Sequence, residues 1–309
     1  MTDHTEGTAH RTAPAAEVEK LGYVGFQTPD LDELVHYYTH ILDFSLVERS
    51  SDAAYLTTGF DHHSVVLERS AEGARARSFV GWEIKDSLDD AERRIRERGY
   101  TTERRKDIAP GSPDTLIVVE PGSGTPLHLY EQIDTTSTPV SWLRPTKLGH
   151  VAAFTPALSD IQGFYEELLG FRWSDTIGDF FVFLRCGPDH HSANFMQSSK
   201  FRDMHHIAYE ARDLNHLQML LDHLAANDHR LEWGPGRHGA GHNIFTYHRD
   251  PAGNVVELFT QLDTISNEAK GHFDPRPWHE DAPQYPKTWQ ADVIAANKWG
   301  PLNPALLEH

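Results

Sequence analysis

The segment LGHV at residues 148–151 decides the fold, because it repeats LGYV at residues 21–24 at an offset of 127. Three further pairs match at offsets of 127 to 129: DHHS at 61–64 and 189–192, FVGWE at 79–83 and HIAYE at 206–210, and PLHLY at 126–130 and VVELF at 255–259. Several separate matches at one slowly drifting offset indicate an internal repeat. The sequence therefore predicts a duplicated chain with two similar halves.

Each half contains the same smaller pattern twice: a short alternating strand, a helix, and two or three strands separated by turns rich in Gly, Asp or Pro. This pattern predicts an α+β fold of four βαβββ modules, paired into two open barrel-like domains. The expected organisation is a disordered lead at 1–17, a first two-module domain at 18–134, a linker at 135–147, a second two-module domain at 148–263, and a tail at 264–309 that wraps the second domain.

The overall composition excludes several classes of partner. The 309 residues include 46 acidic and 28 basic side chains, which gives a net charge of −18. Nucleic acids and anionic membranes are bound through basic patches, so neither is an expected partner. No apolar run approaches the roughly 18 residues of a membrane-spanning helix. The single cysteine, Cys186, excludes an intramolecular disulfide and is typical of a reducing compartment, so we expect a cytoplasmic location.

The two halves differ at three positions that carry metal-ligand chemistry. His150, His206 and Glu257 in the second half align with Tyr, Phe and His in the first. Two imidazoles and one carboxylate from different strands can hold a divalent ion on one side and leave other coordination positions open. This arrangement suits non-haem Fe(II), which we expect ahead of Mn(II), although the ligands alone do not discriminate between the two metals. Each histidine alone is more often a packed core residue, but an acidic residue inside an apolar strand is costly without a positive partner. We therefore predict a metal site in the second half and none in the first.

Other polar residues of the second half are expected close to this site. His238 and Tyr247 precede Glu257 by 19 and 10 residues, so a loop and the following strand can bring both to the metal. Either His190 or His191 is a further candidate, although the repeated pair at 62–63 makes a structural role for one of them plausible. A phosphate-binding loop at GPGRHGAG is rejected, because no Lys-Ser/Thr pair is present and a strand follows.

The motifs LGHVAAF, DHHSANF, MHHIAYEARD, GPGRHG and TYHRDPAGNVVELFTQ resemble those of the type I extradiol ring-cleavage dioxygenases of the vicinal oxygen chelate superfamily, over about residues 20–263. The resemblance implies that His150, His206 and Glu257 bind iron. It also implies catalytic roles for three further residues: an acid-base role for His191, and substrate contacts for His238 and Tyr247. The expected reaction is cleavage of a catechol by O2 next to its two hydroxyl groups, in the breakdown of aromatic compounds. Family members are usually homo-oligomers, so a dimer or tetramer is expected.

The substrate pocket is expected to be apolar and aromatic, with walls from Phe183, Phe195, Trp233 and Phe245 and a mouth covered by the Trp-rich tail (Trp278, Trp289 and Trp299). Some family members bind a substrate carboxylate through arginines and an asparagine, but Trp233 and Ala152 occupy those places here. This departure favours a catechol without an obligatory carboxylate, unless Arg276 in the tail replaces the arginine.

Two other activities of the same superfamily remain open. A glyoxalase-like isomerase or lyase needs a metal but no O2, and it usually spreads its ligands over two modules with a second carboxylate. A 2-oxo-acid dioxygenase shares the His-His-Glu set, although the pairing of His238 with Tyr247 argues against it. A non-enzymatic binding protein of this fold would lack the ligands.

Overall fold

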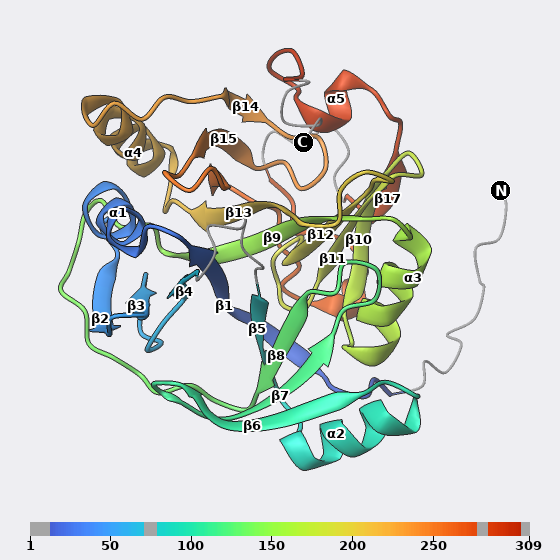
Figure 1. The fold of residues 1–309 in the computed structure, drawn as a ribbon. Helices are drawn as coiled ribbons and strands as arrows, with labels where there is room; N and C mark the ends of the chain where they lie inside the picture. The colour runs from blue at the N-terminus through green and yellow to red at the C-terminus, as the bar shows by residue number, and fades with distance from the viewer. Residues whose placement is uncertain (1–12, 71–78, 277–283, 304–309) are drawn as a thin grey trace, which may run out of the picture.

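The structure is a computed structural model that describes residues 13–70, 79–276 and 284–303 (Figure 1). The first two modules form one sheet, of strand order β2-β3-β4-β1-β5-β8-β7-β6. Their elements are β1 (Val18–Thr28), α1 (Leu31–His36), the π-helical turn η1 (Tyr37–Ile41), β2 (Ser45–Arg49), β3 (Ala53–Thr57), β4 (Val65–Arg69), β5 (Phe79–Ile84), α2 (Leu88–Glu97), β6 (Thr102–Ala109), β7 (Ser112–Val119) and β8 (Pro126–Tyr130).

The last two modules and one strand of the tail, β17 (Lys287–Trp289), form a second sheet, of strand order β14-β15-β16-β13-β9-β12-β11-β10-β17. Their elements are β9 (Lys147–Thr155), α3 (Leu158–Gly163), the π-helical turn η2 (Phe164–Leu168), β10 (Arg172–Ile177), β11 (Phe181–Arg185), β12 (Ala193–Gln197), β13 (Met204–Glu210), α4 (Leu214–Ala226), β14 (Trp233–Arg237), β15 (Ile244–Arg249) and β16 (Val255–Thr260). Paired βαβββ modules in two curved sheets confirm the predicted fold class. No helix in the described ranges is both long and apolar enough to cross a bilayer.

Local sequence explains where the two long helices begin. The Ser87 side chain accepts a hydrogen bond from the Asp90 amide at the start of α2, and the Asp213 side chain accepts one from the His216 amide at the start of α4. Such caps satisfy amides that have no partner within the helix. In each sheet the modules join through antiparallel first strands, β1 with β5 and β9 with β13. The equivalent strands of the two sheets therefore occupy equivalent places.

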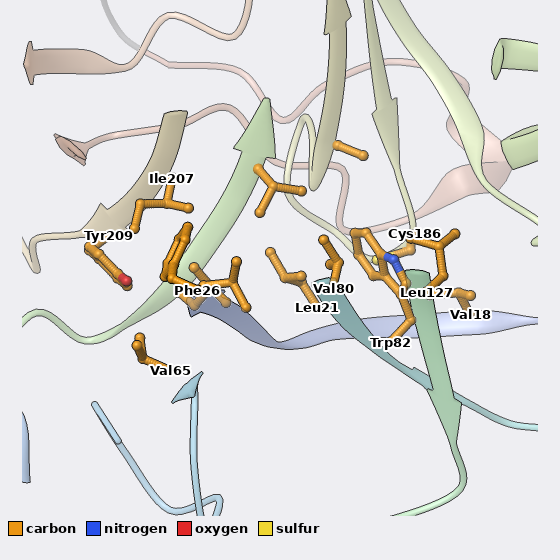
Figure 2. Packing of buried hydrophobic residues seen from close by; sticks show 14 of the residues in the cluster. Val18, Leu21, Phe26, Val65, Val80, Trp82, Leu127, Cys186, Ile207 and Tyr209 are labelled. Atoms are coloured by element: carbon orange, nitrogen blue, oxygen red, sulfur yellow. The ribbon is translucent and has the colours of Figure 1, made fainter. Parts of the chain in front are cut away.

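The two sheets share one hydrophobic core, whose members include Val18, Leu21, Val80, Trp82, Cys186, Ile207 and Tyr209 (Figure 2). Trp82 of the first sheet meets Phe171 edge to face, with ring centroids 5.1 Å apart. Tyr165 of the second half donates a hydrogen bond to Glu120 Oε1 of the first, at 2.8 Å. Because apolar burial is the main favourable contribution to folding, we expect the halves to stabilise one another.

The lead that we expected to be disordered is ordered in its described part, residues 13–17. Ala15 and Ala16 are fully buried, and the Ala16 and Val18 amides donate to the carbonyls of Leu168 and Leu169. The end of η2 leaves these carbonyls without partners of its own, so the incoming chain satisfies them. That part of the prediction was wrong, and residues 1–12 lie outside the described part of the chain.

The tail adds a strand to the second sheet instead of only lying over it. Its elements are the 3-10 helix η3 (Glu268–Lys270), β17 (Lys287–Trp289) and α5 (Val293–Ala296). β17 pairs in parallel with β10, with Asp175 opposite Lys287. The backbone of Lys298, just beyond α5, donates to the Arg237 carbonyl at the end of β14. The tail therefore connects the two edges of the second sheet, as Figure 1 shows for β17 and α5.

Candidate metal centre and active site

Three neighbouring strands bring His150, His206 and Glu257 together. His150 on β9 and Glu257 on β16 both lie opposite Ala208 on the central strand β13. His206 is two residues before Ala208, and side chains two residues apart on a strand point to the same face. The pairing of the strands thus places three side chains, distant in sequence, on one face of the curved sheet.

The three side chains fit a divalent metal ion. The distances between His150 Nε2, His206 Nε2 and Glu257 Oε2 are all 3.2 Å. An octahedral ion with bonds of about 2.2 Å requires neighbouring ligand atoms about 3.1 Å apart. All three side chains are buried. Among the described residues, no other group of His, Cys, Asp or Glu side chains places its ligand atoms close enough together to hold a metal ion. The arrangement is a metal-binding triad.

Neighbouring groups keep the carboxylate ionised and oriented. Burial raises the pKa of Glu257, but the charges and hydrogen bonds of His150 and His206 outweigh burial and hold the pKa well below its usual value. Asn243 Nδ2 donates to Glu257 Oε1 and Tyr247 Oη donates to Oε2, both at 2.8 Å. Partners behind a metal ligand fix its orientation and basicity. Asn243 was not predicted from the sequence.

The first sheet repeats the same arrangement with residues that do not form a triad. Tyr23 and His128 both lie opposite Gly81, just as His150 and Glu257 lie opposite Ala208. Tyr23 Oη is 3.0 Å from His128 Nδ1, and the Phe79 ring stacks on His128. A Cβ atom at Gly81 would come within 2.4 Å of the Tyr23 ring, so a larger residue here would displace that ring. Aromatic rings fill the place that the ligands occupy in the second sheet.

The structure brings His191 into the cavity beside the triad and leaves His190 outside it. The ring centroids of His191 and His150 are 4.3 Å apart. His190 is fully buried, with Nε2 3.1 Å from Asp175 Oδ2 and Nδ1 2.8 Å from His191 Nδ1. Burial, first of all, holds the pKa of His191 well below its usual value. Geometry therefore favours His191 over His190 as the residue that faces a substrate.

His238 and Tyr247 also line the cavity and contact each other. His238 Nε2 is 3.2 Å from Tyr247 Oη, and His238 Nδ1 donates to the Ala296 carbonyl of α5 at 2.5 Å. The His238 ring stacks on Phe245, with centroids 3.8 Å apart. Burial lowers the pKa of His238 to about 4, so its ring is neutral at pH 7. A neutral His238 that donates from Nδ1 presents an acceptor at Nε2.

The cavity has a volume of about 230 Å³ and an apolar wall that includes Phe183 and Trp233. Phe195 does not line it, because Phe195 points to the opposite face of β12 and packs against Tyr165 in the core. Its strand neighbours Asn194 and Met196 line the cavity instead. Phe245 does not line it either, because the His238 ring covers Phe245. Both of these wall predictions were wrong.

The tail supplies wall residues that the sequence did not predict, including Val293, Ala296 and Leu302. Its tryptophans do not: Trp289 and Trp299 are not among the lining residues, and Trp278 lies outside the described residues. Arg276 is not available for a substrate carboxylate. Its Nε donates to buried Asp263 Oδ1 at 3.1 Å, and its guanidinium also contacts the Leu262 carbonyl. The described lining contains no Lys or Arg.

The model of the Glyoxalase/Bleomycin resistance protein/Dioxygenase superfamily matches residues 20–112 and 147–258, which is more than half of the chain. The chain belongs to this superfamily. The first matched segment runs from β1 to the start of β7, and the second runs from β9 into β16 and contains the metal-binding triad.

Relatives of this superfamily member include ring-cleavage enzymes. A metapyrocatechase 2 of Cupriavidus necator is 34% identical over 150 residues, which is 46% of this chain and 47% of that protein, so the alignment spans about half of each. A manganese-dependent 2,3-dihydroxybiphenyl 1,2-dioxygenase of Geobacillus genomosp. 3 is 24% identical over 89% of this chain and 94% of its own. These relatives confirm the resemblance predicted from the motifs.

A solved structure of another protein aligns with this chain over nearly the whole length of both. The Mn(II)-bound glyoxalase of Novosphingobium aromaticivorans superposes with a TM-score of 0.81 at 25% identity, covering 95% of each chain. It shows that the two-sheet arrangement of this chain is that of a known metalloprotein.

Proposed function

We propose that the protein is an Fe(II)-dependent extradiol dioxygenase that uses O2 to open the ring of a catechol next to its two hydroxyl groups. The observation that carries the proposal is the convergence of His191, His238 and Tyr247 on one cavity around the metal-binding triad. Residues 148–263 and the tail build this site, and we propose that residues 18–134 support them without a metal of their own.

When bound, the metal supplies a place where both catechol oxygens and O2 can be held together, and it lowers the pKa of the bound hydroxyl groups. His150, His206 and Glu257 would hold it. Two imidazoles and a carboxylate with open coordination positions suit iron. Because one relative is manganese-dependent, the protein is to be reconstituted with Fe(II) and, separately, with Mn(II).

The surrounding side chains position the substrate and move protons. Tyr247 Oη and His238 Nε2 are 3.2 Å apart, so one catechol oxygen can contact both, and the unprotonated His238 Nε2 can accept its proton. His191 faces the cavity from the β12 side and can first take up a proton from the substrate at this face, and then return it to the oxygen atom on its side of the ring. The apolar wall excludes water, so these hydrogen bonds act in a low dielectric.

We propose that the substrate is a catechol with an uncharged, apolar substituent. Support comes from the lining, in which Phe183, Met196 and Leu302 provide apolar surface and Asp292 provides a negative charge. Burial of an unpaired carboxylate costs several kcal/mol. A carboxylated catechol should therefore react with a kcat/KM lower by about 100-fold or more.

The test is O2 uptake by the metal-loaded protein with 3-methylcatechol, 2,3-dihydroxybiphenyl and homoprotocatechuate. His206→Ala should abolish uptake, while His36→Ala, an exposed histidine on α1, should leave it unchanged. Fe(II) should support faster turnover than Mn(II). Absence of O2 uptake with every catechol would overturn the proposal. A metal-dependent isomerisation without O2 would favour the glyoxalase-like isomerase or lyase. O2 uptake only in the presence of a 2-oxo acid would favour the 2-oxo-acid dioxygenase.

We also propose that the protein is a homo-oligomer, a dimer or tetramer. Support comes from large apolar side chains on the surface: Phe60, Val140 and Trp142 are 81%, 92% and 75% exposed. Where exposed apolar side chains form a contiguous patch, the patch often marks a contact with another protein chain, and Val140 and Trp142 are two residues apart in the linker. Light scattering should give a mass of two or four chains, and a monomer would contradict this proposal. The cytoplasmic location remains a prediction.

A further inference from the structure

A buried carboxylate lies behind the two histidines of the DHHS motif in the second half. Asp175 on β10 is fully buried, and three N–H groups point at it. The Lys287 amide donates to Oδ1 at 2.8 Å, Trp289 Nε1 donates to Oδ2 at 2.7 Å, and His190 Nε2 is 3.1 Å from Oδ2. Two of these donors come from β17 in the tail.

The contacts determine where the protons of both imidazoles lie. The Asp175 carboxylate accepts hydrogen bonds from the Lys287 amide and the Trp289 indole and accepts a third from the His190 ring, so His190 carries its proton on Nε2 and has a lone pair on Nδ1. The Nδ1 atoms of His190 and His191 are 2.8 Å apart and share one hydrogen, which must then belong to His191. His191 Nε2 is left as an acceptor. Among the described residues Nε2 has no hydrogen-bond partner, and the ring lines the cavity.

We propose that Asp175 and His190 are positioning residues that fix the ring and tautomer of His191, so that its Nε2 lone pair faces the substrate. The effect on turnover rests on the proposed dioxygenase function, whereas the effect on the tautomer does not. Asp175 thereby also couples the site to the tail, because β17 supplies two of the three donors that hold the carboxylate.

The first half provides an internal comparison. Its His62 and His63 repeat the histidine pair, with Nδ1 atoms 3.2 Å apart. The strand register places Glu48 on β2 where Asp175 lies on β10, since Glu48 pairs with Tyr55 and Asp175 with Phe183. Glu48 is 56% exposed, however, and 3.9 Å from His62 Nε2, which is too far for a hydrogen bond.

The pair of histidines is thus common to both halves, while the buried carboxylate accompanies only the half with the metal-binding triad. β2 is also the edge strand of its sheet, so no counterpart of β17 lies beside it in the described structure. A purely structural role for the histidine pair would not require Asp175, because the first half keeps its pair without such an anchor.

The first experiment reads the tautomer directly. In the full chain, labelled with ¹⁵N and loaded with diamagnetic Zn(II), two-bond ¹H–¹⁵N correlation spectra distinguish protonated from unprotonated ring nitrogens. The His191 signals are assigned by their loss in His191→Phe. The wild type and Glu48→Gln should show His191 protonated on Nδ1, and Asp175→Asn and His190→Phe should lose this tautomer. Nδ1 protonation that persists in both variants, or its absence from the wild type, would overturn the proposal.

The second experiment measures turnover of a catechol. Asp175→Asn should lower kcat by about 10- to 100-fold, as loss of a partner behind a functional imidazole commonly does, while KM and metal content stay within about twofold. In the His191→Phe background the same substitution should change kcat by no more than about twofold. Glu48→Gln is the matched control and should resemble the wild type.

Equal losses of kcat in both backgrounds would show that Asp175 only docks the tail, and would overturn the proposal. If Asp175→Asn does not fold, His190→Phe takes its place, because it breaks the link to His191 while Asp175 keeps its two donors from β17. If no variant, wild type included, consumes O2 while the tautomer shift is observed, the proposed function fails and the positioning role stands.

Discussion

Replacement of Asn243 with alanine should weaken metal binding without unfolding the protein. The Asn243 amide donates to Glu257 Oε1 at 2.8 Å, and both side chains are buried, at 0% and 1% exposure. A hydrogen bond to a charged group contributes about 1.5–3 kcal/mol, and each 1.4 kcal/mol is about a tenfold change in an equilibrium constant. Tyr247 still holds Oε2, so we expect the dissociation constant for the metal to rise by about 10- to 100-fold.

The assay is competition between the protein and a chelator of known affinity for Mn(II) and, without oxygen, for Fe(II). Asn227→Ala is the matched control, because it removes an amide that donates to the His223 carbonyl at the exposed end of α4. That variant should bind metal like the wild type, and thermal unfolding should confirm that both variants fold. A dissociation constant for Asn243→Ala within about twofold of the wild-type value would refute the idea that Asn243 holds the carboxylate.

Three further perturbations have distinct expected outcomes. Burial raises the pKa of Glu120 to about 7, so the stability that its protonated form contributes is present below pH 4.5 and is lost as the pH rises to about 7. The free energy of unfolding of Glu120→Gln, measured in urea, should therefore exceed that of the wild type by up to about 3 kcal/mol at pH 8 and match it near pH 4. Equal free energies of unfolding at pH 8 would contradict a raised pKa for Glu120. Phe195→Ala should destabilise the fold by about 3–5 kcal/mol with little change in KM, whereas Phe183→Ala should mainly raise KM. A raised KM for Phe195→Ala and an unchanged KM for Phe183→Ala would show that Phe195, and not Phe183, lines the pocket. A chelator should lower the melting temperature of the metal-loaded wild type but not that of His206→Ala, because a bound ion at 100 times its dissociation constant stabilises the native state by about 2.7 kcal/mol; equal shifts would place the metal elsewhere.

Comparison of the two halves was sufficient to identify the fold and the triad, because strand register is the same in both sheets. His150 and Glu257 are opposite Ala208 just as Tyr23 and His128 are opposite Gly81. An alignment of the halves therefore compares positions that are equivalent in space. Ligand chemistry then stands out against aromatic packing.

The pocket wall was harder to predict, because it depends on which face of a strand each residue occupies. Phe195 and Met196 are adjacent and both apolar, and only the pairing of β12 shows that Met196 faces the cavity. Asn243 lies just before β15, and its polar type is compatible with any turn. One signal was available, since a buried Glu257 needs hydrogen-bond donors, but sequence does not say which donor reaches it.

The sequence predicted that a tail follows the second domain, but not that the tail contributes a strand to its sheet. β17 has three residues, KTW, which is too short for an alternating pattern to indicate a strand. Its contribution comes from long-range contacts: the Lys287 amide and the Trp289 indole both reach Asp175. Such contacts are not encoded in local periodicity, and they become visible only once β10 and β17 lie side by side.

The matching register of the two sheets also has a consequence for how such proteins change over evolutionary time. The backbone that supports Tyr23, Phe79 and His128 is paired as it is around the triad. Gain or loss of a metal centre in this scaffold therefore requires point mutations at three positions, with no insertion, deletion or rearranged loop. In a chain with two such halves, one half can keep the metal-binding residues while the equivalent positions of the other half accept substitutions.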